Sequence, residues 1–201
     1  MQAGQALQLL KKQDPIFEQL IRRFGQCQLN PSSRTPFEYL IRSIISQQLS
    51  AKAASTIVGR VEALLGRKHF SAKNIVALSP EQLRACGLSH AKVQYSHGIA
   101  RAVLDKEIDF EQLKVMDSQE VIEQLVKLKG VGEWTAQMFC IFALGHLDIF
   151  APADIGLQRG LQILYQLDEK PSKQQIEDMT SKWKPYRSVA SWYLWRLVDD
   201  N

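Results

Sequence analysis

The fold is decided by a short stretch in the second half of the chain, residues 128–139, which read LKGVGEWTAQMF. Gly130 and Gly132 bracket one apolar residue, and the apolar positions before and after them follow a helical period. Two glycines this close allow a very tight turn, because glycine adopts positive φ and has no Cβ to block an approaching surface. The stretch therefore predicts two helices joined by a short hairpin.

This turn has two possible uses. Successive backbone N–H groups at the start of the second helix can bind a phosphate without regard to base sequence, and the helix dipole strengthens that binding. An ordinary connection between two helices can have the same Gly-Val-Gly pattern. The turn by itself leaves both interpretations open.

Helical signals recur along the rest of the chain. One face of a helix is outlined by Phe37, Leu40, Ile41, Ile44, Ile45 and Leu49. Capping signals begin further helices at Ser50, Ser79, Asp117 and Ser172, and glycines at 66 and 87 end two of them. Alternating apolar and polar runs are almost absent. We therefore expect an all-α protein of about nine to eleven helices.

Composition excludes several classes of protein. The chain has 201 residues, of which 45% are hydrophobic and 23% charged, as in ordinary globular proteins rather than disordered or fibrous ones. Cys27, Cys86 and Cys140 are too few for a four-cysteine metal or iron–sulfur site, and their spacing is typical of reduced thiols inside a cell. No apolar run approaches a membrane span, and the start does not read as a signal peptide. The net charge of +4 is only a mild indication of a polyanionic partner.

Four ordered motifs together resemble one known family. Residues 128–139 are followed by FAPADIGLQRG at 150–160, and this pair resembles the helix-hairpin-helix (HhH-GPD) DNA glycosylases, in particular the alkylated-base, 3-methyladenine glycosylase II branch. Residues 37–54, FEYLIRSIISQQLSAKAA, are similar to the family's duplex-probing helix and loop, and residues 184–198, KPYRSVASWYLWRLV, to its C-terminal helix. The resemblance implies an all-α fold of two helical subdomains, residues 36–150 and residues 1–35 with 151–201, with a cleft between them. It also implies a compact form without the N-terminal β domain of some members.

The same resemblance implies a function. It indicates a monofunctional glycosylase of base excision repair, which hydrolyses the N-glycosidic bond of 3-methyladenine and 7-methylguanine type purines in duplex DNA and leaves an abasic site. Asp154 precedes a helical run and is placed to be its N-cap, which could be its entire role. In the family the matching aspartate is catalytic. An anion there can stabilise the positive charge that develops on the sugar and can orient or deprotonate water.

Two tryptophans, Trp134 and Trp195, bear on the type of reaction and on the base pocket that the resemblance implies. Trp134 occupies the position of the lysine that forms a Schiff base in bifunctional members, and tryptophan has no nucleophilic amine. Trp134 and Trp195 match aromatic positions of the family's base pocket, where an electron-rich ring attracts a cationic alkylated purine. Met138 stands where the family has another pocket aromatic, so the exact base preference stays open. Core packing is the alternative role for either tryptophan.

The resemblance also assigns the residues that contact the duplex. The loop residues Gln47, Gln48 and Leu49 match the wedge that fills the vacated base stack, and Gln48 is the expected plug. A solvated pair of glutamines is the alternative. The phosphate-binding hairpin is expected to comprise Lys129, Gly130, Val131, Gly132 and Thr135. Backbone carbonyls of Val126, Leu128 and Val131 are expected to hold Na⁺ or K⁺, and no other cofactor is expected to be required.

The expected partner is double-stranded DNA with alkylated bases, bound by a monomer in the cytoplasm or nucleoid, or in a nucleus. Candidate phosphate contacts are Lys52, Lys92, Arg101, Lys127, Lys129, Arg159 and Arg187. Two alternatives remain: a glycosylase for other damaged or mismatched bases, and a non-catalytic DNA-binding module. The missing cysteine cluster counts against the iron–sulfur branch. Asp154, Trp134 and Trp195 count against the module, because docking alone requires none of them.

Overall fold

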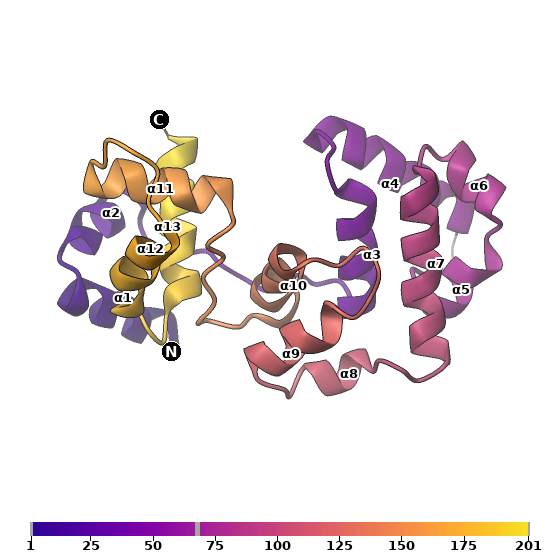
Figure 1. The fold of residues 1–201 in the computed structure, drawn as a ribbon, viewed down its shortest axis with the longest axis horizontal. Coiled ribbons are helices and arrows are strands. Elements are labelled where there is room, and N and C mark those ends of the chain that lie inside the picture. The colour runs from indigo at the N-terminus through magenta and orange to yellow at the C-terminus, as the bar shows by residue number, and fades with distance from the viewer. Residues whose placement is uncertain (1, 67–68, 201) are drawn as a thin grey trace. The chain divides into compact units, whose positions relative to one another are not determined.

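The computed structural model describes residues 2–66 and 69–200, and over these ranges it contains thirteen α-helices, one π-helix and no strand (Figure 1). The chain forms two compact units. The first unit combines residues 1–31 with residues 140–201, and the second unit comprises residues 32–139. The predicted all-α fold class is confirmed.

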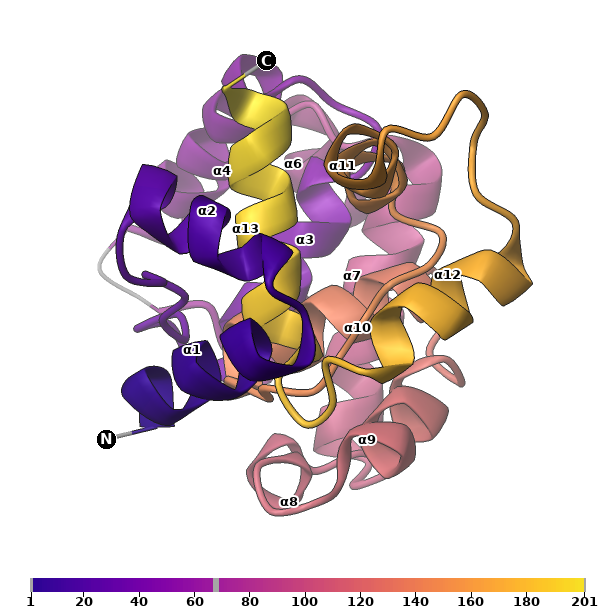
Figure 2. The same ribbon diagram turned by 90° about the vertical axis from the view of Figure 1, so that its left-hand side faces the viewer.

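The first unit is organised around its C-terminal helix. Its elements are α1 (Gln2–Gln13), α2 (Ile16–Phe24), η1 (Cys140–Leu144), α11 (Ile155–Tyr165), α12 (Lys173–Ser181) and α13 (Arg187–Asp199). Helix α13 packs against α2 on one side and α11 on the other (Figure 2). The ring of Phe17 meets Trp183 edge-on at 5.3 Å and Tyr193 at 6.0 Å. Edge-to-face packing of this kind suits buried aromatic rings and fixes how the helices pack together.

The second unit is organised around α3 and α7. Its helices are α3 (Pro36–Ser46), α4 (Ala51–Leu65), α5 (Ala72–Ala77), α6 (Pro80–Ala85), α7 (His90–Leu104), α8 (Phe110–Leu113), α9 (Ser118–Leu125) and α10 (Glu133–Phe139). Helix α3 packs on α4, α7 and α10. Its apolar face is fully buried, with Leu40, Ile41, Ile44 and Ile45 at most 1% exposed. The predicted helical face is therefore the core of this unit, except that Leu49 lies beyond the end of α3.

The predicted helix starts are confirmed. Ser79, Asp117 and Ser172 each accept a hydrogen bond from the N–H group three residues on, and each forms a capping box with the side chain of that same residue, Gln82, Glu120 and Gln175 respectively. Ser50 caps α4 through the amide of Ala53. These caps satisfy backbone donors that the first turn of a helix otherwise leaves without partners.

The number of helices exceeds the expected nine to eleven. Helix α5 has six residues and α8 has four. Such short helices do not complete two turns, so they leave too few apolar positions for a periodic pattern.

The division of the chain differs from the predicted boundaries at 35/36 and 150/151. Residues 140–150 belong to the first unit, and hydrogen bonds connect them to α13. Ser188 N–H donates to the carbonyl of Leu147 at 2.9 Å, and the Ser188 hydroxyl accepts from the amide of Ile149 at 2.9 Å. Among the described helices, none is long and apolar enough to span a bilayer.

Candidate active site

The predicted hairpin joins α9 to α10, and its two glycines play different structural roles. Gly130 has φ +93°, and a Cβ there would lie 2.3 Å from the ring of Tyr95. Gly132 is exposed, and a Cβ there would meet nothing within 4 Å. Val131 is buried between them, and its N–H donates to Leu128 O at 3.0 Å. Gly130 is therefore required by the fold, whereas Gly132 leaves the backbone open to a partner from outside.

Of the two side chains predicted to belong to the phosphate-binding hairpin, Lys129 and Thr135, one is exposed and the other is buried. Lys129 is exposed. Thr135 is 7% exposed, and its hydroxyl oxygen lies 3.4 Å from the side-chain amide nitrogen of Gln47. The structure thus places Lys129 where a phosphate can reach it and directs Thr135 into the protein.

The probing loop, Gln47–Leu49, joins α3 to α4. Gln48 has φ +56°, a left-handed conformation that side-chain-bearing residues seldom adopt. Gln48 and Leu49 are exposed, and Leu49 retains 37% of its surface. Gln47 is half-buried, and its side-chain amide donates to the carbonyl of Gly130 at 3.0 Å. The amide of Gln47 is directed at the hairpin, so Gln48 and Leu49 are the two loop side chains turned to solvent.

The probing loop and the hairpin border one polar hollow of about 440 Å³ in the second unit. The N-terminal turns of α7 complete its wall. Its lining residues are Gln47, Gln48, Ser89, Ala91, Lys92, Tyr95, Gly130, Val131 and Gly132. The structure therefore brings together two motifs that are more than eighty residues apart in the sequence.

Asp154 lies in the first unit, at the N-terminus of α11, and its predicted capping role is confirmed. Its Oδ1 accepts the N–H of Leu157 at 2.8 Å. The same oxygen accepts the indole N–H of Trp195 at 3.1 Å. These two N–H donors fix the orientation of the carboxylate at the start of the helix. The pairing of Asp154 with Trp195 joins α11 to α13.

Two residues that the sequence did not single out shape this carboxylate site. The ring of Phe142, in η1, lies 5.6 Å from the ring of Trp195. A Cβ at Gly156 would lie 3.1 Å from Asp154 Oδ1 and 3.2 Å from Trp195 Cδ1. Gly156 therefore leaves the room in which the indole reaches the carboxylate. The sequence signal that could have indicated Gly156 is a glycine two residues after a capping aspartate.

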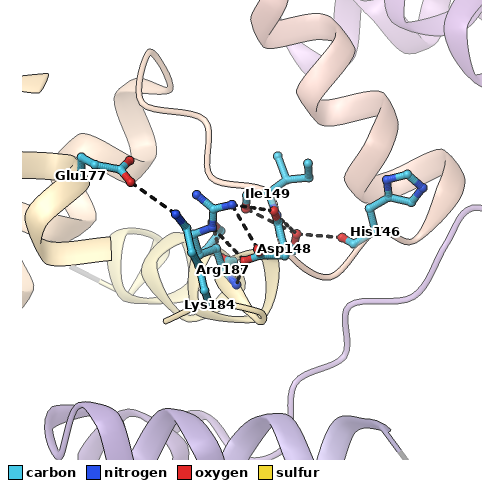
Figure 3. A network of polar contacts seen from close by, with 8 residues as sticks. His146, Asp148, Ile149, Glu177, Lys184 and Arg187 are labelled. Carbon is cyan, nitrogen blue, oxygen red and sulfur yellow. Dashed lines mark hydrogen bonds and ion pairs between the residues drawn. The ribbon is translucent and has the colours of Figure 1, made fainter. Parts of the chain in front are cut away.

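The segment before Asp154 is fixed to α13 by the polar network of Figure 3. Arg187 donates through Nε to Asp148 Oδ1 at 2.7 Å and through Nη2 to Asp148 Oδ2 at 3.1 Å (Figure 3). The Ser188 hydroxyl donates to the carbonyl of His146 at 2.7 Å. Two parallel bonds between a guanidinium and a carboxylate fix orientation as well as distance. Arg187, a candidate phosphate contact from the sequence, is thus engaged within the protein.

The other predicted pocket side chains lie on α10 of the second unit. Trp134, in its first turn, is 45% exposed, and Met138, one turn later, is 9% exposed. The remaining basic candidates Lys52, Arg101, Lys127 and Arg159 are exposed. Trp134 is therefore accessible from the surface, whereas Met138 is buried.

The described residues offer neither a reactive thiol nor a side-chain metal site. Burial raises the pKa of Cys140 to about 12, and it also raises the pKa of the thiols of Cys27 and Cys86. Thiols with raised pKa values are poor nucleophiles. Over the described ranges no three His, Cys, Asp or Glu side chains are grouped to hold a metal ion.

Sequence and structure comparisons identify the family. Residues 41–185 match the HhH-GPD superfamily of base excision DNA repair proteins. The match covers more than half of the chain, so the chain belongs to this superfamily.

Named relatives belong to the alkylated-base branch. The chain is 35% identical to the alkylbase DNA glycosidase-like protein of Schizosaccharomyces pombe, over 92% of this chain and 88% of that protein. The structure of the DNA-3-methyladenine glycosidase from Bacillus halodurans superimposes with a TM-score of 0.88, at 39% identity over 96% of this chain and 88% of that one. The S. pombe 3-methyladenine DNA glycosylase in complex with abasic DNA gives a TM-score of 0.85 and 31% identity, over 96% and 95% of the two chains. The predicted family and branch are confirmed.

Proposed function

We propose that this chain is a monofunctional DNA glycosylase that hydrolyses alkylated purines from duplex DNA and leaves an abasic site. The observation that carries the proposal is the Asp154 carboxylate, which the Trp195 indole and the start of α11 hold in place in a member of a base excision repair superfamily. The named relatives that act on 3-methyladenine support the choice of substrate.

The reaction breaks the bond between C1′ of the sugar and the nitrogen of the base. An alkylated purine carries positive charge, so it departs as a neutral base with the bonding electron pair, and the sugar is left with oxocarbenium character. The carboxylate of Asp154 stabilises that charge. Water then bonds to C1′ and loses a proton to Asp154 or to solvent. Because the base leaves readily, one carboxylate is a sufficient catalytic group.

The other sites keep the roles that the family resemblance implies. Base recognition is assigned to Trp134, Met138 and Trp195. Gln48 is assigned as the wedge, supported by its exposure and by the inward bonds of Gln47. Phosphate binding is assigned to Lys129 and to the backbone of Gly130, Val131 and Gly132, supported by the open surface at Gly132. Thr135 belongs to the same turn.

The hairpin is also the proposed site of a monovalent cation. The carbonyl oxygens of Val126, Leu128 and Val131 are the ligand type that Na⁺ and K⁺ take, and Leu128 O already accepts the N–H of Val131 at 3.0 Å. A carbonyl oxygen has two lone pairs, so this bond leaves capacity for a cation. The cation would add positive charge where a phosphate docks. The protein is proposed to act as a monomer on chromosomal DNA, in the nucleoid or nucleus.

The experiment that tests the proposal profiles the bases released by the purified chain from alkylated, deaminated and oxidised duplexes, with detection by mass spectrometry. Release of 3-methyladenine and 7-methylguanine is expected. Release confined to uracil, mismatched or oxidised bases would overturn the alkylpurine assignment, and binding without any release would indicate a DNA-docking module.

A further inference from the structure

Lys92 makes contacts that a phosphate-binding lysine does not make. It lies in the first turn of α7, and its side chain is half-buried. Its Nζ donates to the carbonyl of Ile45 at 2.8 Å and to the carbonyl of Gln47 at 2.6 Å. These carbonyls belong to the C-terminal end of α3, where a helix has acceptors without intrahelical donors. The ammonium group therefore caps α3 at the point where the probing loop begins.

The probing loop is held from a second direction by Gln47. Its side-chain amide donates to Gly130 O at 3.0 Å and lies 3.4 Å from Thr135 Oγ1. The carbonyl of Gln47 is bonded to Lys92 while its side chain is bonded to the hairpin. This pair of residues, Lys92 and Gln47, is named the loop brace below.

Helix α7 supports the hairpin as well as the loop. The ring of Tyr95, one turn after Lys92, packs so closely on Gly130 that a Cβ there would lie 2.3 Å from it. The loop and the hairpin therefore share one platform, the first two turns of α7. Desolvation by burial also lowers the pKa of Lys92, in keeping with an ammonium group withdrawn from water.

Gln48, the residue that follows Gln47 of the loop brace, has an unusual backbone conformation. Gln48 has φ +56°, a left-handed conformation that is unfavourable for a residue other than glycine. Such a conformation persists only where the surroundings impose it. Leu49 N–H donates to Ser46 O at 3.2 Å, and Ser50 caps the next helix, so the loop is fixed at its far end too.

We propose that Lys92 is a positioning residue for base extrusion: with Gln47 it fixes the probing loop to the phosphate-binding hairpin, so that Gln48 is presented to the base stack in a defined geometry. The inference rests on the proposed function and extends it. It assigns to Lys92 a role inside the protein in place of the phosphate contact that its charge indicates. Wedge and hairpin then act as one rigid element.

The test compares Lys92→Met with Lys73→Met. Methionine keeps an apolar stem and removes the ammonium group, and exposed Lys73 in the same unit provides the same change of charge. Single-turnover release of 7-methylguanine is measured from two duplexes, one with cytosine opposite and one with a tetrahydrofuran abasic analogue opposite. Lys92→Met is expected to be about tenfold slower than the wild type on the first duplex, where the wedge has to contact the unpaired cytosine in a defined geometry. On the second duplex it is expected to be within about twofold of the wild type, because there is no opposite base for the wedge to contact. Lys73→Met is expected to match the wild type on both.

A readout that does not depend on catalysis accompanies the rates. A duplex with a tetrahydrofuran analogue opposite 2-aminopurine is titrated with protein, and the change in fluorescence reports contact of the wedge with the unpaired base. The change is expected to be smaller for Lys92→Met and for Gln47→Leu, which removes the other half of the brace. Gln47→Leu also keeps the inference testable should Lys92→Met fail to fold.

Three results would overturn the inference: an equal loss of rate on both duplexes, no loss on either, or a decrease of about 1 in the slope of log K against log salt, which indicates a lost phosphate contact. If the wild type releases no base from either duplex, the proposed function fails, while the fluorescence titration still tests the brace.

Discussion

Two aspartates of the first unit each accept an indole N–H, and their differences separate a structural carboxylate from the proposed catalytic one. Trp183 donates to Asp14 and Trp195 to Asp154, both at 3.1 Å. Asp14 is 6% exposed and also accepts bonds from the Tyr165 hydroxyl and from Lys182 Nζ, the latter at 2.9 Å. Asp14 thus has a charged partner and no access for a substrate.

Asp154 has a different environment. It is half-buried, and the donors Leu157 N–H and Trp195 Nε1–H are both uncharged. The next residue, Ile155, is 80% exposed. Each of these two neutral donors orients the carboxylate without itself adding an opposite charge. Partial exposure at the N-terminus of a helix therefore distinguishes Asp154 from the buried Asp14.

The largest expected effect comes from exchanging each carboxylate for an amide. Asp154→Asn is expected to slow single-turnover base release by about 100-fold or more, because the negative charge opposite the sugar is lost. Asn caps helices as well as Asp, so the melting temperature is expected to stay almost unchanged. Asp14→Asn is the matched control, and the rate of its folded fraction is expected to equal that of the wild type. Equal rates for wild type and Asp154→Asn would remove the distinction.

Removing the structural carboxylate tests the other side of the comparison. Asp14→Ala leaves the donors of Tyr165 and Trp183 without their acceptor, and it is expected to lower the free energy of unfolding by about 3 kcal/mol. Urea denaturation followed by circular dichroism measures it. A loss well below about 1 kcal/mol, the typical net value of one hydrogen bond, would show that the Asp14 network contributes little to stability.

The two indoles should separate in the same way. Trp195→Phe keeps an aromatic ring but removes the N–H. Because the carboxylate of Asp154 then loses a charge-assisted hydrogen bond, base release is expected to slow about tenfold, while the free energy of unfolding changes little. Trp183→Phe is expected to leave the rate unchanged and to cost about 1–2 kcal/mol of stability. Rates and denaturation curves of both variants check this, and the reverse assignment of effects would refute it.

The smallest effect concerns pH. Burial raises the pKa of Asp14, but hydrogen bonds from Tyr165, Lys182 and Trp183 and the charge of Lys182 outweigh it, so the pKa lies below its ordinary 3.8. The unfolded chain therefore binds a proton at a higher pH than the folded one, and the stability from Asp14 is present above about pH 4 and is lost as pH falls through the folded pKa. Denaturation at several acidic pH values should show a flatter decline for Asp14→Ala than for wild type. An identical decline would mean that Asp14 has the same pKa in the folded and the unfolded chain.

Local features of this fold could be predicted from the sequence. The capping boxes at Ser79, Asp117 and Ser172, the tight turn at Gly130 and the cap at Asp154 depend on residues within a few positions of one another. Their physics is contained in one turn of the chain, so spacing is enough to reveal it.

Long-range pairings could not be predicted in this way. Trp195 is 41 residues from Asp154, and Arg187 is 39 residues from Asp148. The residue type alone does not reveal whether a lysine or arginine side chain binds a phosphate or a group within the protein. Lys92 and Arg187 were therefore both candidate phosphate contacts. Only the packing of α7 on α3, and of α13 beside the segment before α11, decides between those partners.

Monofunctional base release is tested most directly by following one duplex that contains a single 7-methylguanine during incubation with excess protein. Free base and strand length are measured together, with and without alkali. We expect 7-methylguanine to be released and the strand to stay intact until alkali cleaves the abasic site. Absence of free base, or a strand cut without alkali, would contradict a monofunctional alkylpurine glycosylase.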